Sequence, residues 1–212
     1  MTLYPIHADL QGKRCVVVGA GAVAERKVAA LRECGAVIRL VAPQATPPLQ
    51  RLAEEGAVTW MRNMYHAAHL DGAFLVIAAT DLREVNEAVA RDAQGRNILV
   101  CRADEPAGGN FLSPASVTRG DLVLTVSTSG LSPTLAAVLR RRLEDEFGPE
   151  WGPLTALLGS VRAPVQAAGD EAARRAAVRR IIDDAGVRDL LRGGNFAEAE
   201  ARARECLSWS SE

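Results

Sequence analysis

The chain has 212 residues, of which 48% are hydrophobic and 24% are charged, a balance that is typical of folded globular proteins and excludes extensive disorder. Its 25 basic and 26 acidic residues give a net charge of −1, which argues against a protein that binds nucleic acid or a membrane surface through a polybasic face. The four cysteines form no CxxC pair, the N-terminus lacks a signal-peptide pattern, and no apolar run approaches the ~20 residues of a membrane span, so we expect a cytoplasmic protein without a structural zinc site.

Short apolar runs alternate with amphipathic segments over the first half of the chain. We predict strands at 14–19, 37–41, 58–61, 74–79 and 98–102, with helices at 22–34, 47–55 and 81–94. Asp81 and Glu84 form a capping-box pattern at the start of the third helix. Continuous apolar strands are buried on both faces of a sheet, and their alternation with helices is typical of a parallel α/β sheet with right-handed crossovers.

The alternation ends after residue 103. Turn-forming residues occupy 104–110, and residues 122–127 alternate like a strand with one face free for a partner. Ser132 and Pro133 predict the start of a helix that reaches Phe147. Only helical patterns follow. We therefore predict an α/β domain over 1–113, a strand-and-helix dimerisation segment over 114–150, and a helical C-terminal domain over 151–212.

Residues 19–24 read Gly-Ala-Gly-Ala-Val-Ala, a GxGxxA pattern between a predicted strand and a predicted helix. Gly19 allows the tight turn, Gly21 lets the backbone approach a pyrophosphate, and Ala24 lets the helix pack closely on the strand. The N–H groups at the start of the helix would bind the phosphates. The pattern indicates a Rossmann-like dinucleotide-binding domain, and a tight turn without a ligand is the alternative.

The end of the second predicted strand bears on the choice between NAD and NADP. It reads Leu-Val-Ala-Pro-Gln over residues 40–44, without the usual acidic residue for the ribose and without arginines for a 2′-phosphate. Gln44 or backbone groups could bind the ribose, so we expect NAD. Thr80 and Asp81 follow the fourth strand, at the edge where such folds bind ligands; they could line the nicotinamide site, cap the next helix, or do both.

Asp104 is the candidate catalytic residue, because it follows the fifth strand on the same edge and could act as a general base. The alternative is a solvated aspartate in a turn. His66 and His69 share a helical spacing but have no third ligand nearby in the sequence, so we expect surface residues rather than a metal site.

Several motifs together resemble the siroheme-synthase family, and most closely its precorrin-2 dehydrogenase module. They are Pro5-Ile6, the glycine-rich run from Val18 to Lys27, Ala78-Ala79-Thr80-Asp81, Asn86, Asp104, Phe111-Leu112-Ser113-Pro114-Ala115 and the run from Ser127 to Pro133. The likeness covers most of residues 1–150. The family's fused methyltransferase domain is expected to be absent.

The resemblance implies NAD-dependent oxidation of precorrin-2 to sirohydrochlorin by a homodimer that interlocks through residues 114–147. It implies that Asp104 matches the family's essential aspartate. It also implies NAD contacts from Ala22, Val23, Pro43 and Gln44. Insertion of Fe²⁺ or Co²⁺ into sirohydrochlorin, an activity of some members, stays open. Some members carry a phosphorylated serine at the position of Thr128.

A tetrapyrrole substrate with many carboxylates needs cationic clamps. Arg102 and Arg119 are the candidates for this role, with the run at 140–142 as a further candidate or a solvated helix face. The competing hypothesis is a dimeric regulatory module that senses NAD(H) without catalysis. The Asp104 loop favours the enzyme, since a sensor has no need of an acid beside the cofactor.

Overall fold

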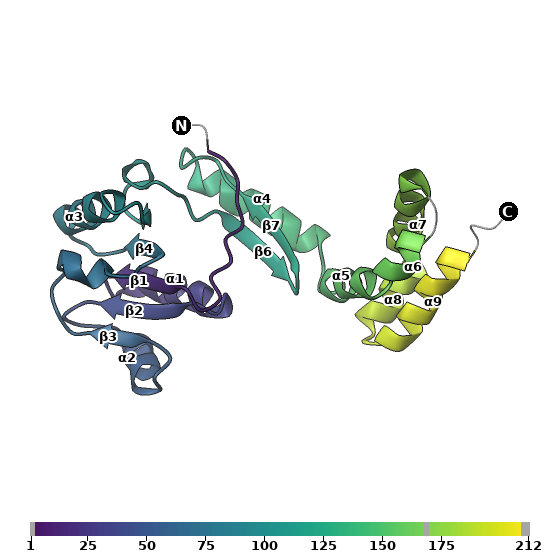
Figure 1. Ribbon diagram of the computed structural model, residues 1–212, viewed down its shortest axis with the longest axis horizontal. Coiled ribbons are helices and arrows are strands. Elements are labelled where there is room, and N and C mark those ends of the chain that lie inside the picture. Colours follow the sequence, from purple (N-terminus) through teal and green to yellow (C-terminus); the bar gives the residue numbers. More distant parts are fainter. Residues whose placement is uncertain (1–2, 168–169, 209–212) are drawn as a thin grey trace. The chain divides into compact units, whose positions relative to one another are not determined.

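The computed structural model describes residues 3–167 and 170–208. The chain divides into two compact units, Met1–Ser113 and Pro114–Glu212 (Figure 1). The first unit is an α/β domain, and the second unit contains a two-stranded sheet and six helices among its described residues.

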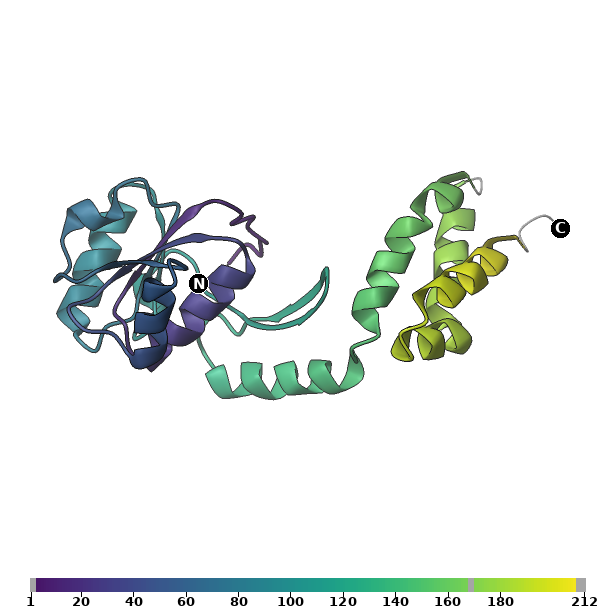
Figure 2. The ribbon, with the colours of Figure 1, turned by 90° about the horizontal axis from the view of Figure 1, so that it is seen from below.

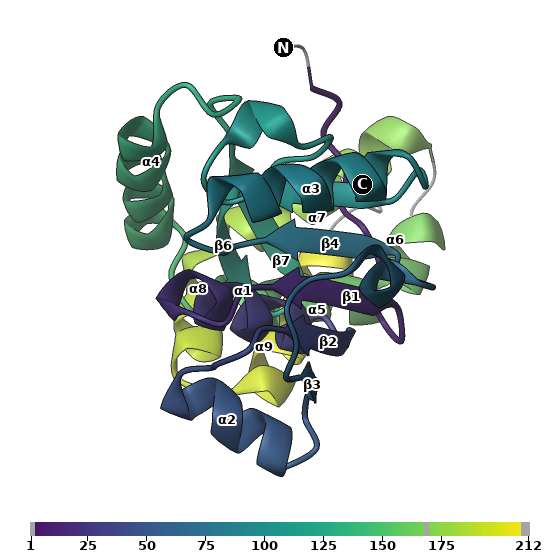
Figure 3. The ribbon, with the colours of Figure 1, turned by 90° about the vertical axis from the view of Figure 1, so that its left-hand side faces the viewer.

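The first unit contains one parallel sheet of five strands, so the predicted α/β fold is confirmed. Its elements are β1 (Arg14–Val18), α1 (Ala22–Glu33), β2 (Val37–Val41), α2 (Pro47–Glu54), β3 (Thr59–Met61), η1 (Ala67–Leu70), β4 (Leu75–Ala78), α3 (Arg83–Gln94), β5 (Leu99–Arg102) and η2 (Pro106–Gly108). The strand order is β3-β2-β1-β4-β5, and Figure 3 shows β4, β1, β2 and β3 following one another in the sheet. The order reverses between β1 and β4, which is the position where doubly wound sheets bind ligands.

Helices cover both faces of this sheet. The face with α1 and α2 contains Cys15, Val17, Ala24, Val28, Leu31, Ile38, Leu40, Leu49, Leu75 and Ile77, all buried. The face with α3 and η1 contains Val16, Val18, Val41, Leu70, Val76, Ala78, Val89, Ala90, Ala93 and Val100, also buried. Because neighbouring residues of each central strand enter opposite cores, these strands are continuous apolar runs in the sequence.

The Asn110 side chain completes the outer edge of the sheet beside β5. Its Oδ1 atom accepts the N–H of Val100 at 2.7 Å, and its Nδ2 atom donates to the carbonyl of Ile98 at 3.0 Å. The backbone N–H of Asn110 donates to the carbonyl of Val100 at 2.9 Å. These bonds satisfy part of an open strand edge and hold the loop after β5 against the strand that carries Arg102.

The second unit begins with an antiparallel hairpin of β6 (Ala115–Arg119) and β7 (Leu122–Val126), followed by α4 (Pro133–Glu146). The predicted strand at 122–127 is present as β7, but the prediction omitted β6. The polar residues of β6 and the proline that precedes it gave it a weak strand pattern. The Ser132 side chain accepts the N–H of Leu135 at 3.2 Å, which confirms the predicted N-cap.

The remaining helices share a core of their own (green to yellow in Figure 2). They are α5 (Trp151–Ser160), α6 (Arg162–Ala167), α7 (Glu171–Asp183), α8 (Ala185–Arg192) and α9 (Phe196–Ser208). A Cβ atom on Gly152 of α5 would lie 2.9 Å from the carbonyl carbon of Arg119, so α5 packs tightly on the hairpin. The division at residue 150 therefore stays a prediction. No helix of the described residues is long and apolar enough to span a membrane.

Candidate active site

The glycine-rich turn connects β1 to α1 at the carboxyl edge of the sheet. Gly19 has a φ of 103°, and a Cβ atom there would lie 2.3 Å from the carbonyl oxygen of Ala79, so only glycine fits. Gly21 is the N-cap of α1, and a Cβ atom on it would meet nothing within 4 Å. The start of α1 has no side-chain cap among the described residues. Open space beside uncapped N–H groups fits a pyrophosphate.

The segment after β2 lies beside this turn. The N–H of Gly19 donates to the carbonyl of Val41 at 2.9 Å, and the N–H of Thr46 donates to the carbonyl of Ala20 at 3.1 Å. Between these two bonds, Pro43 and Gln44 are exposed. Their position next to the turn is compatible with the predicted contact to the adenosine part of a dinucleotide.

A cleft of about 380 Å³ opens at the same edge of the sheet. It is lined by Val23, Ala79, Thr80, Asp81, Arg83, Asn86, Ala103 and Asp104. Four of the predicted site residues, which come from three separate segments of the sequence, thus meet around one cavity. They are Val23, Thr80, Asp81 and Asp104.

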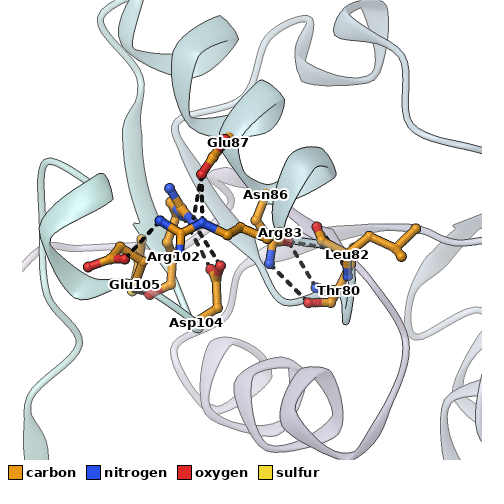
Figure 4. A network of polar contacts seen from close by, with 9 residues as sticks. Thr80, Leu82, Arg83, Asn86, Glu87, Arg102, Asp104 and Glu105 are labelled. Atoms are coloured by element: carbon orange, nitrogen blue, oxygen red, sulfur yellow. Dashed lines mark hydrogen bonds and ion pairs between the residues drawn. The ribbon is translucent and has the colours of Figure 1, made fainter.

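The buried Asn86 side chain holds the end of β4 in place (Figure 4). Its Oδ1 atom accepts the N–H of Thr80 at 3.1 Å and lies 2.8 Å from the Thr80 hydroxyl, while its Nδ2 atom donates to the Thr80 carbonyl at 2.9 Å. The predicted capping box is wrong, because α3 begins at Arg83 with Leu82 as its N-cap and without a side-chain cap. The Thr80–Asn86 bonds replace it and leave Asp81 on the wall of the cleft.

Asp104 is paired with Arg102 (Figure 4). The Arg102 side chain is only 6% exposed, and it donates from Nη2 to Oδ2 of Asp104 at 2.8 Å and from Nε to Oδ1 at 3.2 Å. These hydrogen bonds hold the pKa of the Asp104 carboxyl below its usual value. Arg102 was predicted to clamp substrate; two of its donors bind Asp104 instead, and its role toward substrate stays a prediction.

Arg119, the other predicted clamp, is the last residue of β6 in the second unit, and its side chain reaches the end of α4. Its guanidinium donates to the backbone carbonyls of Phe147 at 3.0 Å, Thr118 at 3.1 Å and Glu144 at 3.4 Å. These bonds satisfy carbonyl groups that a helix end otherwise leaves unpaired. The structure therefore gives Arg119 a capping role, and its role toward substrate stays a prediction.

Arg83 is a cleft residue that the sequence analysis did not single out. Its side chain is 69% exposed and binds Glu87 at 2.9 Å and Glu105 at 3.3 Å. Its position in the sequence could have predicted this place, because the first turn of a helix that follows a parallel strand lies at the ligand-binding edge of the sheet. Unlike Arg102, it presents its guanidinium to solvent at the cleft.

The histidines form no metal site in the described part of the chain. The N–H of His66 donates to Nδ1 of His69 at 3.0 Å, which caps the short helix η1. No group of three or more potential metal-ligating side chains occurs among the described residues. A larger cavity of about 770 Å³ lies in the second unit. Arg202 and Asp184 in its lining bind each other at 2.7 Å and 3.1 Å, so these two charges compensate each other.

Comparisons with known proteins agree with this geometry. Residues 6–115 match the family model described as "Putative NAD(P)-binding", and residues 119–146 match "Sirohaem biosynthesis protein central". The siroheme synthase of Chromobacterium violaceum is 37% identical over 208 residues, which are 98% of this chain and 44% of that protein. The siroheme synthase of Xylella fastidiosa is 40% identical over 209 residues, with coverages of 97% and 44%.

A solved structure titled "SirC, precorrin-2 dehydrogenase" is also similar, with a TM-score of 0.72 and 25% identity over 96% of this chain and 100% of that one. The chain spans less than half the length of the curated relatives it matches. The resemblance to siroheme synthases is confirmed by these relatives. The chain belongs to the NAD(P)-binding family whose model covers its first unit, among the proteins related to siroheme synthases.

Proposed function

We propose that the chain oxidises precorrin-2 to sirohydrochlorin with NAD as the hydride acceptor. The observation that carries the proposal is the cleft at the strand-order reversal, where Val23, Thr80, Asp81 and Asp104 meet. Similarity to a precorrin-2 dehydrogenase over nearly the whole chain gives this cleft its substrate class. The Asp104 carboxylate on its wall, which a sensor would not need, supports a catalytic rather than a purely sensing role.

Residues on three loops would hold the cofactor. Gly19, Gly21, Ala22 and Val23 would bind the pyrophosphate at the start of α1, and Pro43 and Gln44 would contact the adenosine ribose. Thr80 and Asp81 would flank the nicotinamide. The bound cofactor supplies a hydride acceptor. The choice of NAD rests on the absence of arginine from residues 40–44, because a 2′-phosphate needs a cationic partner there.

Asp104 would act on the substrate from the wall of the cleft. Oxidation removes a hydride to the cofactor and a proton to a base or to water, so positive charge develops on the substrate as the hydride leaves. A fixed carboxylate stabilises that charge. Because Arg102 lowers the pKa of Asp104, the carboxylate is a weaker base than a free aspartate, which favours the electrostatic role over strong proton abstraction.

Substrate carboxylates would be bound by cations that remain accessible at the cleft. Arg83 fits this role, since its side chain is 69% exposed and borders the same cavity as Asp104. Its partners Glu87 and Glu105 orient the guanidinium without burying it.

The test is an assay of the purified chain with precorrin-2 and either NAD or NADP, which follows the reduced nicotinamide and the sirohydrochlorin chromophore. We expect turnover with NAD. Asp104→Asn keeps the shape of the side chain and removes its charge, so NAD affinity should persist while turnover falls by roughly 10²–10³-fold, the cost of losing one electrostatic stabiliser. Wild-type turnover in Asp104→Asn would refute the role of the carboxylate, and a preference for NADP would refute the cofactor assignment.

Metal insertion is tested in the same preparation. Adding Fe²⁺ or Co²⁺ to sirohydrochlorin and following the loss of the metal-free chromophore separates the two activities. If Asp104→Asn loses only metal insertion, the carboxylate serves the metal step alone, and hydride transfer relies on the positioning of the two reactants.

A further inference from the structure

Arg102 is a charged side chain that is almost completely shielded from solvent. It is the last residue of β5, its side chain is 6% exposed, and Nε and Nη2 both point to the Asp104 carboxylate (Figure 4). Removing a charge from water is costly unless an opposite charge compensates it. The Asp104 carboxylate is that partner, and the two bonds from Arg102 also fix the plane of the carboxylate.

The loop after β5 is folded tightly over this arginine. A Cβ atom on Gly108 would lie 2.6 Å from both Cδ and Nη1 of Arg102, and one on Gly109 would lie 2.4 Å from the carbonyl oxygen of Val100. The Asn110 side chain anchors the end of the loop to β5. Any side chain at 108 would therefore have to displace the Arg102 guanidinium, which fills that space.

Three further charged side chains lie close to the Arg102–Asp104 pair. Glu87 of α3 lies 3.8 Å from Nη2 of Arg102, and Arg83 bridges Glu87 and Glu105. Asp81 lines the cleft with Asp104. The Asp104 side chain keeps 30% of its surface exposed, so it can meet a substrate while Arg102 stays covered.

We propose that Arg102 is a positioning residue, which fixes both carboxylate oxygens of Asp104 and maintains the anion at the wall of the cleft. The effect of this positioning on catalysis rests on the proposed function. An aspartate in an exposed loop samples several rotamers, and a displacement of about 1 Å can cost about 10²-fold in rate. The bonds to Arg102 remove that freedom before substrate binds.

The first experiment is kinetic and uses Arg102→Met and Arg102→Lys in the full chain. For Arg102→Met we expect kcat for precorrin-2 oxidation to fall about 10²-fold with little change in KM. The acidic limb of its pH profile should also move to higher pH, because Asp104 then protonates closer to its ordinary pKa. Arg102→Lys keeps the charge without the paired donors, so it should restore the acidic limb more than kcat. A rise in KM alone would make Arg102 a substrate clamp and overturn the proposal.

The second experiment needs neither substrate nor cofactor. Titration of ¹³C-labelled aspartate carboxyls by NMR, with Asp104→Asn to assign the signal, should show Asp104 titrating below the ordinary range in the wild type. The midpoint should rise in Arg102→Met. If Asp104 titrates identically in both proteins, the positioning role is refuted. This result stands even if the chain proves inactive toward precorrin-2, so failure of the proposal and failure of the proposed function are distinguishable.

Gly108→Ala tests the same contact from the loop side. The added methyl group must displace Arg102, so kcat should fall while KM stays near its wild-type value, as in Arg102→Met. Gly95→Ala is the matched control, because a Cβ atom there lies at an ordinary 3.4 Å from its nearest neighbour. Circular dichroism establishes that both variants fold. Equal, wild-type kcat values in the two folded variants would contradict the proposed packing.

Discussion

At the scale of single residues, the cleft is built from polar groups that satisfy one another in pairs. Arg102 and Asp104 form one pair, and Asn86 and Thr80 form the other. Sequence position predicted Asp104, Thr80 and Asp81 as cleft residues because each follows a parallel strand at the ligand edge. The roles of Arg102 and Asn86 could not be predicted, since a pairing depends on rotamers and on the path of the loop after β5.

Asn86 gives a prediction about stability. Asn86→Ala removes three hydrogen bonds at Thr80 and leaves the part-buried N–H and C=O groups of that residue without their side-chain partner. Because leaving such groups unsatisfied costs about 1–3 kcal/mol, we expect urea denaturation to show a free energy of unfolding that is lower by about this amount. Asn63→Ala, at an exposed position, is the control and should leave the unfolding free energy unchanged. Equal stabilities of the two variants would contradict the role given to Asn86.

At the scale of elements, hydrophobic periodicity was sufficient where a strand is buried on both faces. The predicted strand at 37–41 coincides with β2, and the other four parallel strands differ from the prediction by one or two residues at their ends. Periodicity failed for β6, whose exposed and polar positions reduce the apolar signal. The capping-box motif failed at the start of α3, where Asn86 bonds Thr80 and Leu82, not Asp81, is the N-cap.

The glycine-rich turn gives a prediction about the cofactor. Gly21→Asp should fold, because a Cβ atom at this position meets nothing within 4 Å. The carboxylate would then stand beside the start of α1, where it competes with the pyrophosphate for the same N–H groups. We expect calorimetry to show that NAD binding is lost. Gly159→Asp, at an equally open position in the second unit, should bind NAD as the wild type does. Unchanged NAD affinity in Gly21→Asp would refute the assignment of the turn.

At the scale of the whole molecule, the second unit exposes more apolar surface than a solvated segment needs. In α4, a helix of 14 residues, only Ala136 is buried. Leu131, Leu135 and Val138 are 89%, 49% and 42% exposed, and Val123 of β7 is 40% exposed. Leu135 and Val138 are three residues apart and so lie on the same side of α4, and exposed apolar side chains that gather on one surface mark an interaction site. These side chains favour the homodimer that the sequence analysis predicts.

The dimer prediction can be tested on the surface of α4. Leu135→Glu introduces a charge on the exposed apolar side of the helix, and burying that charge in an interface without a partner is unfavourable. We expect light scattering at micromolar concentration to give a dimer mass for the wild type and a monomer mass for Leu135→Glu. Ala137→Glu adds the same charge at another exposed position of α4, about 200° around the helix from Leu135, and should remain dimeric. A wild-type chain that is monomeric under these conditions would refute the homodimer. Dissociation of both variants would show that the interface is not limited to the apolar side of α4.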